Sequence, residues 1–284
     1  MISAGVRYMF FSVLFFSVMQ VIVKYLNHVP VFQIILFRTL ISMGICLFML
    51  TRQKVSPWGN NKMLLVLRGV FGVLALSCFF YSLQHTPLGP AITIVNIKPF
   101  LILVLGFLLL KEKVLPIQWV LFIVSFCGIL LIKGFDTTIS FLELGTLLGA
   151  AFFAAIAHTI VRKLKDSDHP LVIIFYFTLI TFPIAFPIAM LHWVELSLLD
   201  LVLLLSVGIV THFGQFFLTK AYQQGAIASV SLVYYLGIVF ALMFGYLFFD
   251  EMFDWIVILG ITLIVGSILL NVLFVQRAKS KRTN

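Results

Sequence analysis

The chain alternates between long apolar runs and short polar connections, and this alternation is its dominant pattern. The runs cover residues 6–26, 32–50, 63–84, 89–110, 116–132, 143–162, 171–191, 199–221, 226–248 and 254–275. A transmembrane α-helix needs about 20 mostly apolar residues. The connections carry Gly, Pro, Asn and Asp, which are typical of turns. The pattern therefore predicts an all-α integral membrane protein with ten transmembrane helices.

Composition supports a membrane protein and argues against metal or cofactor chemistry. Hydrophobic residues make up 62% of the chain and charged residues only 10%, whereas a soluble domain carries about 25% charge. The three cysteines, Cys46, Cys78 and Cys127, all fall within apolar runs and show no CxxC spacing. This disfavours a disulfide or a thiolate metal site. We expect neither a metal site nor a cofactor.

The basic residues gather on one side of the predicted spans. If the N-terminus is cytoplasmic and the spans alternate, the cytoplasmic side receives Arg7, Arg52, Lys54, Lys62, Lys111, Lys113, Arg162, Lys163, Lys165, Lys220, Arg277, Lys279, Lys281 and Arg282. Only Lys24 and Lys133 lie near the outer ends, so the positive-inside rule predicts that both termini are cytoplasmic. The net charge of +9 is therefore an orientation signal, and no nucleic-acid partner is expected.

The chain repeats itself after a shift of 139 positions. This shift superposes Gly69 on Gly208 and Gln84 on Gln223, and it lays the string GFLLLKE on GYLFFDE. Each half holds five spans, an odd number, so the second half enters the membrane upside down and the repeats are predicted to be inverted. The predicted domains are a first five-helix repeat at 1–138, a second at 139–276 and a cytoplasmic basic tail at 277–284. Inverted repeats with a site near the midplane are a design of secondary transporters.

Short motifs recur at the ends of the spans. Phe37-Arg38 opens the second span and Leu67-Arg68-Gly69 opens the third, while apolar-Gly-apolar-Glu endings run from Gly106 to Glu112 and from Gly245 to Glu251. In this order and spacing they resemble the drug/metabolite transporter superfamily, and within it the EamA-type branch, over nearly the whole chain. The resemblance implies ten helices in two inverted repeats around a cavity bounded by spans 1, 3, 4, 6, 8 and 9. It also implies alternating-access transport of a small metabolite, and it favours a bacterial inner (cytoplasmic) membrane over an organelle membrane.

Lys98 lies near the middle of the fourth span, beside Pro99. An ionisable residue at this depth is costly and usually functional. The alternative is a lysine whose side chain reaches back to the headgroups. Either end of the span is roughly 15–20 Å away at 1.5 Å per residue, which is too far for such a reach. We therefore expect Lys98 to face a cavity.

Polar residues at helical spacing predict the other cavity-lining side chains. The candidate substrate-binding residues are Gln20, Arg38, Tyr81, Gln84, Asn96, Lys98, His158, His212, Gln215, Tyr234 and Tyr235. The alternative for each is an interhelical hydrogen bond, which contributes roughly 0.6 kcal/mol on average within a membrane. Glu112 and Glu251 end their spans and are expected to anchor helix ends or form salt bridges.

Two charged residues within the predicted spans of the first half have no charged counterparts in the second half. The 139-residue shift places Arg38 on Phe177 and Lys98 on Gly237, so both cations are special to the first half. We expect Phe177 to contribute packing more than selectivity. No carboxylate lies deep in a span, so two alternatives remain for Lys98. A buried lysine can lose its proton, or a bound anion can balance its charge, which points to a carboxylate- or phosphate-bearing substrate. For Arg38 the alternative is a conformational role at the outer end of the second span. With only His158 and His212 as relay candidates, facilitated diffusion or exchange is favoured over proton symport.

Three functions remain open at this point. The favoured one is a secondary transporter for a small organic anion or an amino acid-like zwitterion. The second is an exporter of aromatic or amphipathic compounds, including drugs. The third, a membrane-embedded lipid-modifying enzyme, needs convergent catalytic groups. The chain has no HExxH, no GxSxG and no Asp-rich pair within a span, so we expect no enzyme activity. The expected partners are a small-molecule substrate and the lipid bilayer, with a monomer or homodimer left open.

Overall fold

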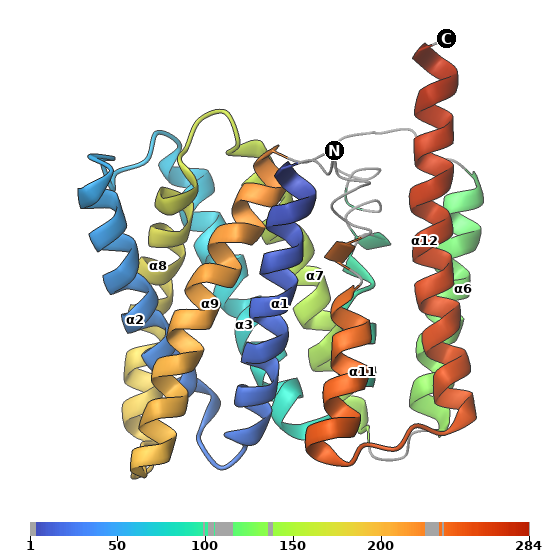
Figure 1. The fold of residues 1–284 in the computed structure, drawn as a ribbon, viewed down its shortest axis with the longest axis horizontal. Coiled ribbons are helices and arrows are strands. Elements are labelled where there is room, and N and C mark those ends of the chain that lie inside the picture. Colours follow the sequence, from blue (N-terminus) through green and yellow to red (C-terminus); the bar gives the residue numbers. More distant parts are fainter. Residues whose placement is uncertain are drawn as a thin grey trace.

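The computed structural model of the chain describes residues 4–98, 100–101, 105, 116–135, 139–224, 233–234 and 236–283. All regular structure in these ranges is helical (Figure 1), so the all-α fold class is confirmed there. The helices are α1 (Ala4–Tyr25), α2 (Val31–Arg52), α3 (Lys62–His85), α4 (Leu88–Val95), α6 (Pro116–Phe135), α7 (Phe141–Lys163), α8 (Pro170–Leu191), α9 (Leu198–Gln224), α11 (Leu236–Phe249) and α12 (Trp255–Thr283).

Six of the described helices, α1, α2, α3, α7, α8 and α9, are 22 to 27 residues long and apolar enough to cross a membrane. A helix satisfies its backbone donors and acceptors internally, which is why hydrocarbon tolerates it. Local signals fix where two of these helices start. Ser140 and Glu143 form a reciprocal capping box at the start of α7, and Pro170 occupies the first turn of α8 behind His169, whose ring accepts from the Leu171 amide.

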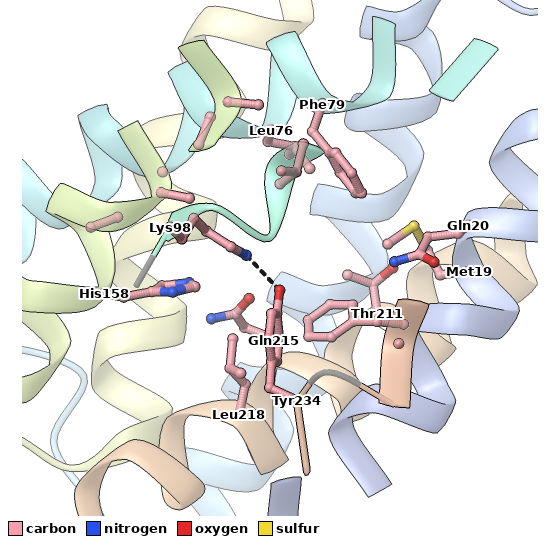
Figure 2. A pocket seen from close by; sticks show the side chains of 18 of the residues that line it. Met19, Gln20, Leu76, Phe79, Lys98, His158, Thr211, Gln215, Leu218 and Tyr234 are labelled. Carbon is pink, nitrogen blue, oxygen red and sulfur yellow. Dashed lines mark hydrogen bonds between the residues drawn. The ribbon is translucent and has the colours of Figure 1, made fainter. Parts of the chain in front are cut away.

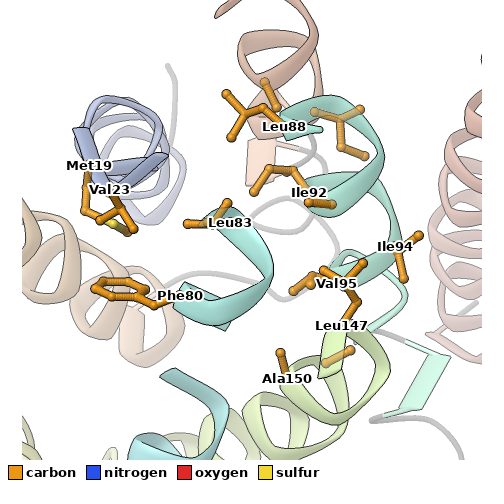
Figure 3. Close-up of a cluster of buried hydrophobic side chains, with 14 of the residues drawn as sticks. Met19, Val23, Phe80, Leu83, Leu88, Ile92, Ile94, Val95, Leu147 and Ala150 are labelled. Atoms are coloured by element: carbon orange, nitrogen blue, oxygen red, sulfur yellow. The ribbon is translucent and has the colours of Figure 1, made fainter. Parts of the chain in front are cut away.

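The two halves of the chain interleave. α1 packs against α9, α3 against α7, α2 against α8 and α6 against α12, so each pair joins one helix from each half. Figure 1 shows α6 and α12 together at one edge of the bundle and α2 with α8 at the other. Buried side chains of α1, α3, α4 and α7, among them Met19, Leu83, Val95 and Leu147, form one continuous core (Figure 3).

Two glycine contacts bring the halves into close approach. A Cβ on Gly69 would lie 2.8 Å from Cβ of Ile180, and a Cβ on Gly208 would lie 2.6 Å from Cβ of Ile41. Both glycines and both isoleucines are related by the 139-residue shift found in the sequence. Only glycine lets α3 and α8, or α2 and α9, pack this closely.

A pair of glutamine side chains follows the same shift. Gln84 Nε2 donates to the carbonyl oxygens of Leu26 and Val29, each at 2.9 Å. Gln223 Nε2 donates to the carbonyl oxygen of Asp168 at 3.2 Å, the residue that the shift pairs with Val29. Each amide therefore ties the end of one helix to the connection between two others.

The fourth apolar run departs from the single helix predicted over 89–110. In the described residues, α4 ends at Val95 and a turn follows at Asn96 and Ile97. The Asn96 side chain donates to the Ile92 carbonyl oxygen at 2.9 Å, a local bond that competes with helix continuation. Helical backbone resumes at Lys98, where the Phe100 amide donates to the Ile97 carbonyl oxygen at 3.0 Å. The break leaves Lys98 just beyond the end of α4.

The close glycine contacts generate a stability prediction. We expect Gly208→Ala to lower the apparent unfolding temperature in detergent, because its Cβ overlaps Ile41 and overpacking costs about 1–3 kcal/mol. Gly145→Ala on α7 is the matched control, since a Cβ there meets no atom within 4 Å. Both variants gain the same helix propensity, so their difference isolates the clash. A Gly208→Ala protein as stable as Gly145→Ala would contradict the close approach.

Candidate functional site

A cavity of about 140 Å³ lies inside the bundle (Figure 2). Its walls come from α1, α3, α4 with the turn after it, α7, α9, and Tyr234 with the start of α11. These correspond to the six spans that the family resemblance implies. Two further helices contribute, because α2 supplies Arg38 and α8 supplies Phe177. The volume is similar to that of an engineered cavity of about 150 Å³ that holds benzene, so it suits a small molecule.

Most of the candidate residues predicted from sequence line this cavity. They are Gln20, Arg38, Asn96, Lys98, His158, Gln215 and Tyr234. Sequence reasoning did not select Arg68 or Phe177 as lining residues, although Arg68 belongs to one of the motifs and Phe177 is the counterpart of Arg38. The depth of Arg68 in its span is a signal that would have included it.

The Lys98 side chain points across the cavity at Tyr234 (Figure 2). Its Nζ donates a hydrogen bond to the Tyr234 hydroxyl at 2.5 Å and lies 4.6 Å from the ring centroid. Only 7% of the residue is exposed. The amine therefore lies inside the bundle and does not reach the headgroups, and the tyrosine offers it both a hydroxyl and the face of a ring.

Arg38 and Arg68 rest on the same aromatic ring. Their Cζ atoms lie 5.1 Å and 4.5 Å from the ring centroid of Phe177. Both residues are almost completely buried, with exposures of 3% and 2%. Within the described part of the chain, Nε and Nη1 of each guanidinium have no hydrogen-bond partner. Neither of these two Arg38 nitrogens caps a described helix end, and the Phe177 ring contacts both guanidiniums in addition to its packing.

Several neutral polar atoms of the cavity wall also lack a hydrogen-bond partner within the described residues. Within the described ranges, Gln20 Oε1, Asn96 Oδ1, His158 Nδ1 and Thr211 Oγ1 are buried without a hydrogen-bond partner. Buried polar atoms in native proteins are nearly always paired. Groups left unpaired around one cavity are therefore available to a small molecule that enters it.

The charge of the cavity is positive. Arg38, Arg68 and Lys98 all contribute to the wall, and no aspartate or glutamate is among the described lining residues. Groups of three or more His, Cys, Asp or Glu with metal-binding geometry are likewise absent from the part of the chain that the structure describes. The chemistry this arrangement supports is binding of an anionic or polar molecule through hydrogen-bond donors.

The carboxylate of Glu251 lies beside the end of α1 and the start of α4, away from the cavity wall. Its Oε1 is 2.9 Å from Lys24 Nζ, and its oxygens accept from the backbone amides of Leu88 at 2.8 Å and Gly89 at 3.5 Å. Lys24 Nζ also donates to the Thr86 carbonyl oxygen at 2.8 Å. Glu251 therefore has the anchoring and salt-bridging role expected for it, at the start of α4, where a negative charge is favoured.

Three candidates from the sequence lie elsewhere, and their placement needs correction. Gln84 bonds the carbonyls of the α1–α2 connection, as described above. Tyr81 is stacked on His85, with ring centroids 4.3 Å apart, and is not part of the wall. At about 100° per residue both lie on roughly the opposite face of α3 from the cavity residues Gly72, Leu76 and Phe79, so they meet other neighbours. Tyr235 lies outside the described residues.

His212 is the third predicted site residue that does not line the cavity. Its Nδ1 and Ser42 Oγ are hydrogen-bonded at 3.0 Å, so the imidazole joins α9 to α2. Gln215, one turn further along α9, lines the cavity instead. Residues three apart on a helix differ by about 60° in direction, which is enough to separate a helix interface from a cavity.

Comparisons with known proteins agree on one family. Residues 3–134 and residues 142–273 each match the model of the EamA-like transporter family. The pseudopaline exporter CntI of Pseudomonas aeruginosa (strain UCBPP-PA14) is 31% identical over 268 residues, which cover 93% of this chain and 94% of the exporter. Solute carrier family 35 member G1 of Mus musculus is 31% identical over 283 residues, covering 93% of this chain and 76% of the carrier.

Two further comparisons extend this likeness. The S-adenosylmethionine uptake transporter of Rickettsia prowazekii (strain Madrid E) is 25% identical over 285 residues, covering 98% of this chain and 95% of the transporter. One solved crystal structure superposes with a TM-score of 0.73 at 16% identity, covering 96% of this chain and 98% of the other. At that identity the structural likeness concerns the fold alone.

The placement of α9 generates a labelling prediction. In a background with Cys46, Cys78 and Cys127 replaced by alanine, we expect Gln215→Cys to react with a small anionic thiosulfonate roughly tenfold or more faster than His212→Cys. The reason is that a thiol packed between helices is shielded from the reagent. Initial labelling rates on purified protein measure the difference. Equal rates, or a faster His212→Cys, would contradict the orientation of α9.

Proposed function

Because the chain belongs to the EamA-like transporter family, we propose that it is a secondary transporter that moves a small organic anion or zwitterion across the cytoplasmic membrane by alternating access. Its general role is that of a multi-pass membrane transporter and not an enzyme. The relatives are named for export of pseudopaline and for uptake of S-adenosylmethionine, and both names describe movement of a small molecule.

The observation that carries the choice of an anion is the charge of the cavity. Three cationic side chains contribute to one wall, and the described lining residues include no carboxylate. Burying charges without partners is costly, and an arginine does not lose its proton to escape that cost. An anion in the cavity neutralises the wall and accepts from the open guanidinium nitrogens. A zwitterion does the same through its acidic group.

We infer that the halves 1–138 and 139–276 are inverted five-helix repeats, giving ten transmembrane helices. The family match to each half separately supports this division. The paired contacts of Gly69 and Gly208, which obey one sequence shift, support a common structure. The positive-inside bias supports cytoplasmic termini, and in Figure 1 the start of α1 and the end of α12 lie on the same side.

The network at the outer end supports a state closed to the outside. Lys24 and Glu251 join α1 to the segment after α11, and the same glutamate holds the start of α4. Lys24 follows the cavity residues of α1 and Leu88 precedes those of α4, so in the proposed orientation this network lies on the outer side of the cavity. We propose that this network breaks when the transporter opens outward. Such rearrangement around a fixed central site is how alternating access operates in transporters with repeats.

Ligand stabilisation of the purified protein tests the anion proposal. Wild type and Lys98→Ala are heated with carboxylates, phosphates, amino acids, and neutral or cationic aromatic compounds. Ligand at 100 times its Kd adds about 2.7 kcal/mol to the free energy of unfolding, so a stabilised protein melts measurably later. We expect acidic ligands to stabilise wild type and to lose most of that effect in Lys98→Ala, with transport in proteoliposomes abolished in parallel.

The control for this experiment is Lys62→Ala, which removes an exposed cation at the start of α3. It is expected to respond to ligands as wild type does. Lys98→Arg keeps the charge with a different shape, so partial loss is expected. Stabilisation only by neutral or cationic aromatics, unchanged in Lys98→Ala, would refute the anion proposal and favour an exporter of aromatic compounds.

The outer network generates a separate prediction about conformation. We expect Glu251→Gln to raise the rate at which an impermeant thiosulfonate, added to intact cells, labels Gln215→Cys by several-fold, because the Lys24 ion pair is lost while the side-chain shape is kept. Lys165→Gln is the matched control, since it removes the exposed Lys165–Asp166 pair instead. An unchanged rate in Glu251→Gln would show that other contacts close the outer end.

A further inference from the structure

The two buried arginines form a local arrangement that the anion proposal does not use in full. Arg38 comes from α2 and Arg68 from α3, while the ring that supports them comes from α8. Each arginine is buried to more than nine-tenths and lines the cavity. Four of their nitrogens, Nε and Nη1 of each, have no hydrogen-bond partner among the described residues.

Neighbouring guanidiniums with open donors are suited to an acidic group. A guanidinium presents its N–H groups as a planar fork that matches the two oxygens of a carboxylate or the oxygens of a phosphate. Phe177 attracts both cations through its ring face, but a ring supplies no lone pair for an N–H donor. The open nitrogens therefore lack an acceptor that an acidic ligand provides.

The α3 backbone next to Arg68 leaves room for the Arg68 guanidinium and for the Phe177 ring. A Cβ at Gly72, one turn after Arg68 on α3, would overlap Nη1 of Arg68 and would lie 2.8 Å from the Phe177 ring. Gly72 itself lines the cavity. The absence of a side chain at this position is what allows the guanidinium and the ring to lie where they do.

Lys98 contacts a different aromatic side chain in the same cavity. Its amine contacts the ring and hydroxyl of Tyr234, whereas the arginines contact Phe177. An ammonium has three donors, so the bond to Tyr234 does not exhaust them. A ligand with one acidic group meets either the arginine pair or the lysine. A ligand with an acidic group at each end meets both.

We propose that Arg38 and Arg68 form a second anion subsite, and that the substrate carries two separate acidic groups, one held by this pair and one by Lys98. This rests on the proposed function as an anion transporter and deepens it. The substrate class is a small dianion whose ends are carboxylates, or a carboxylate and a phosphate-like group. A cavity of about 140 Å³ limits the chain between them to a few atoms.

The test compares acids that differ by one charged end. Binding of succinate, butyrate and 3-phosphonopropionate to the purified full-length protein is measured by calorimetry at neutral pH. We expect wild type to bind succinate at least about tenfold more tightly than butyrate, since hydrogen bonds to charged groups contribute on this scale. The relative affinity of 3-phosphonopropionate tells whether a phosphate-like end is preferred.

Two variants address the arginine pair by different means. Arg68→Gln removes one charge, and Gly72→Ala keeps every charge but displaces the Arg68 guanidinium and the Phe177 ring. In both we expect the preference for succinate over butyrate to fall below about twofold while butyrate still binds through Lys98. Gly237→Ala is the control, because it adds a methyl to the same cavity wall with Val13 no closer than 3.7 Å.

The outcomes separate this inference from the proposed function. Equal binding of succinate and butyrate to wild type, or a preference for succinate that persists in folded Gly72→Ala, overturns the second subsite. Lys98-dependent binding of acids would then leave the anion transporter standing. Failure of all three acids to bind wild type overturns the dianion inference, whereas the proposed function fails only if no acidic ligand of the wider panel stabilises wild type either.

Discussion

Three buried cations rest on aromatic rings in the middle of the bundle, and the rest of the cavity follows from how those charges are supported. Lys98 lies against Tyr234, and Arg38 and Arg68 share Phe177. The cations come from the first half of the chain and the rings from the second. Neither half alone supports its own charge, so the cavity exists only where the halves interleave.

The carboxylates are kept at the ends of the helices. Glu251 binds Lys24 at the end of α1 and the first amides of α4. Asp200 accepts from Ser197 and contacts His28 at the start of α9, and Asp168 accepts from the Asn60 amide beside α3. Negative charge is stabilised at helix N-termini. This segregation leaves the interior with positive charge and open donors, and those donors are the chemical basis for proposing an anion as the substrate.

The break after α4 joins the backbone to the site. The helix ends at Val95, Asn96 closes it with a bond to Ile92, and Lys98 follows at once. Irregular backbone at membrane depth is tolerated where it lines a cavity. The same feature that weakens the helix thus delivers an amine and an amide oxygen to one cavity wall.

Apolar runs and the 139-residue shift were sufficient to predict an all-helical membrane transporter, and the motifs at the span ends indicated its family by resemblance. The depth of Lys98 was sufficient to predict its direction. These properties depend on local composition and on position along one span. Tertiary structure decided which polar residues share a cavity. His212 and Gln215 lie on one stripe of α9, yet one meets Ser42 and the other the cavity. The pairing of Arg68 with Phe177 joins helices from different halves. Helical periodicity defines a broad face, and only the neighbouring helices determine which part of that face is packed and which is open.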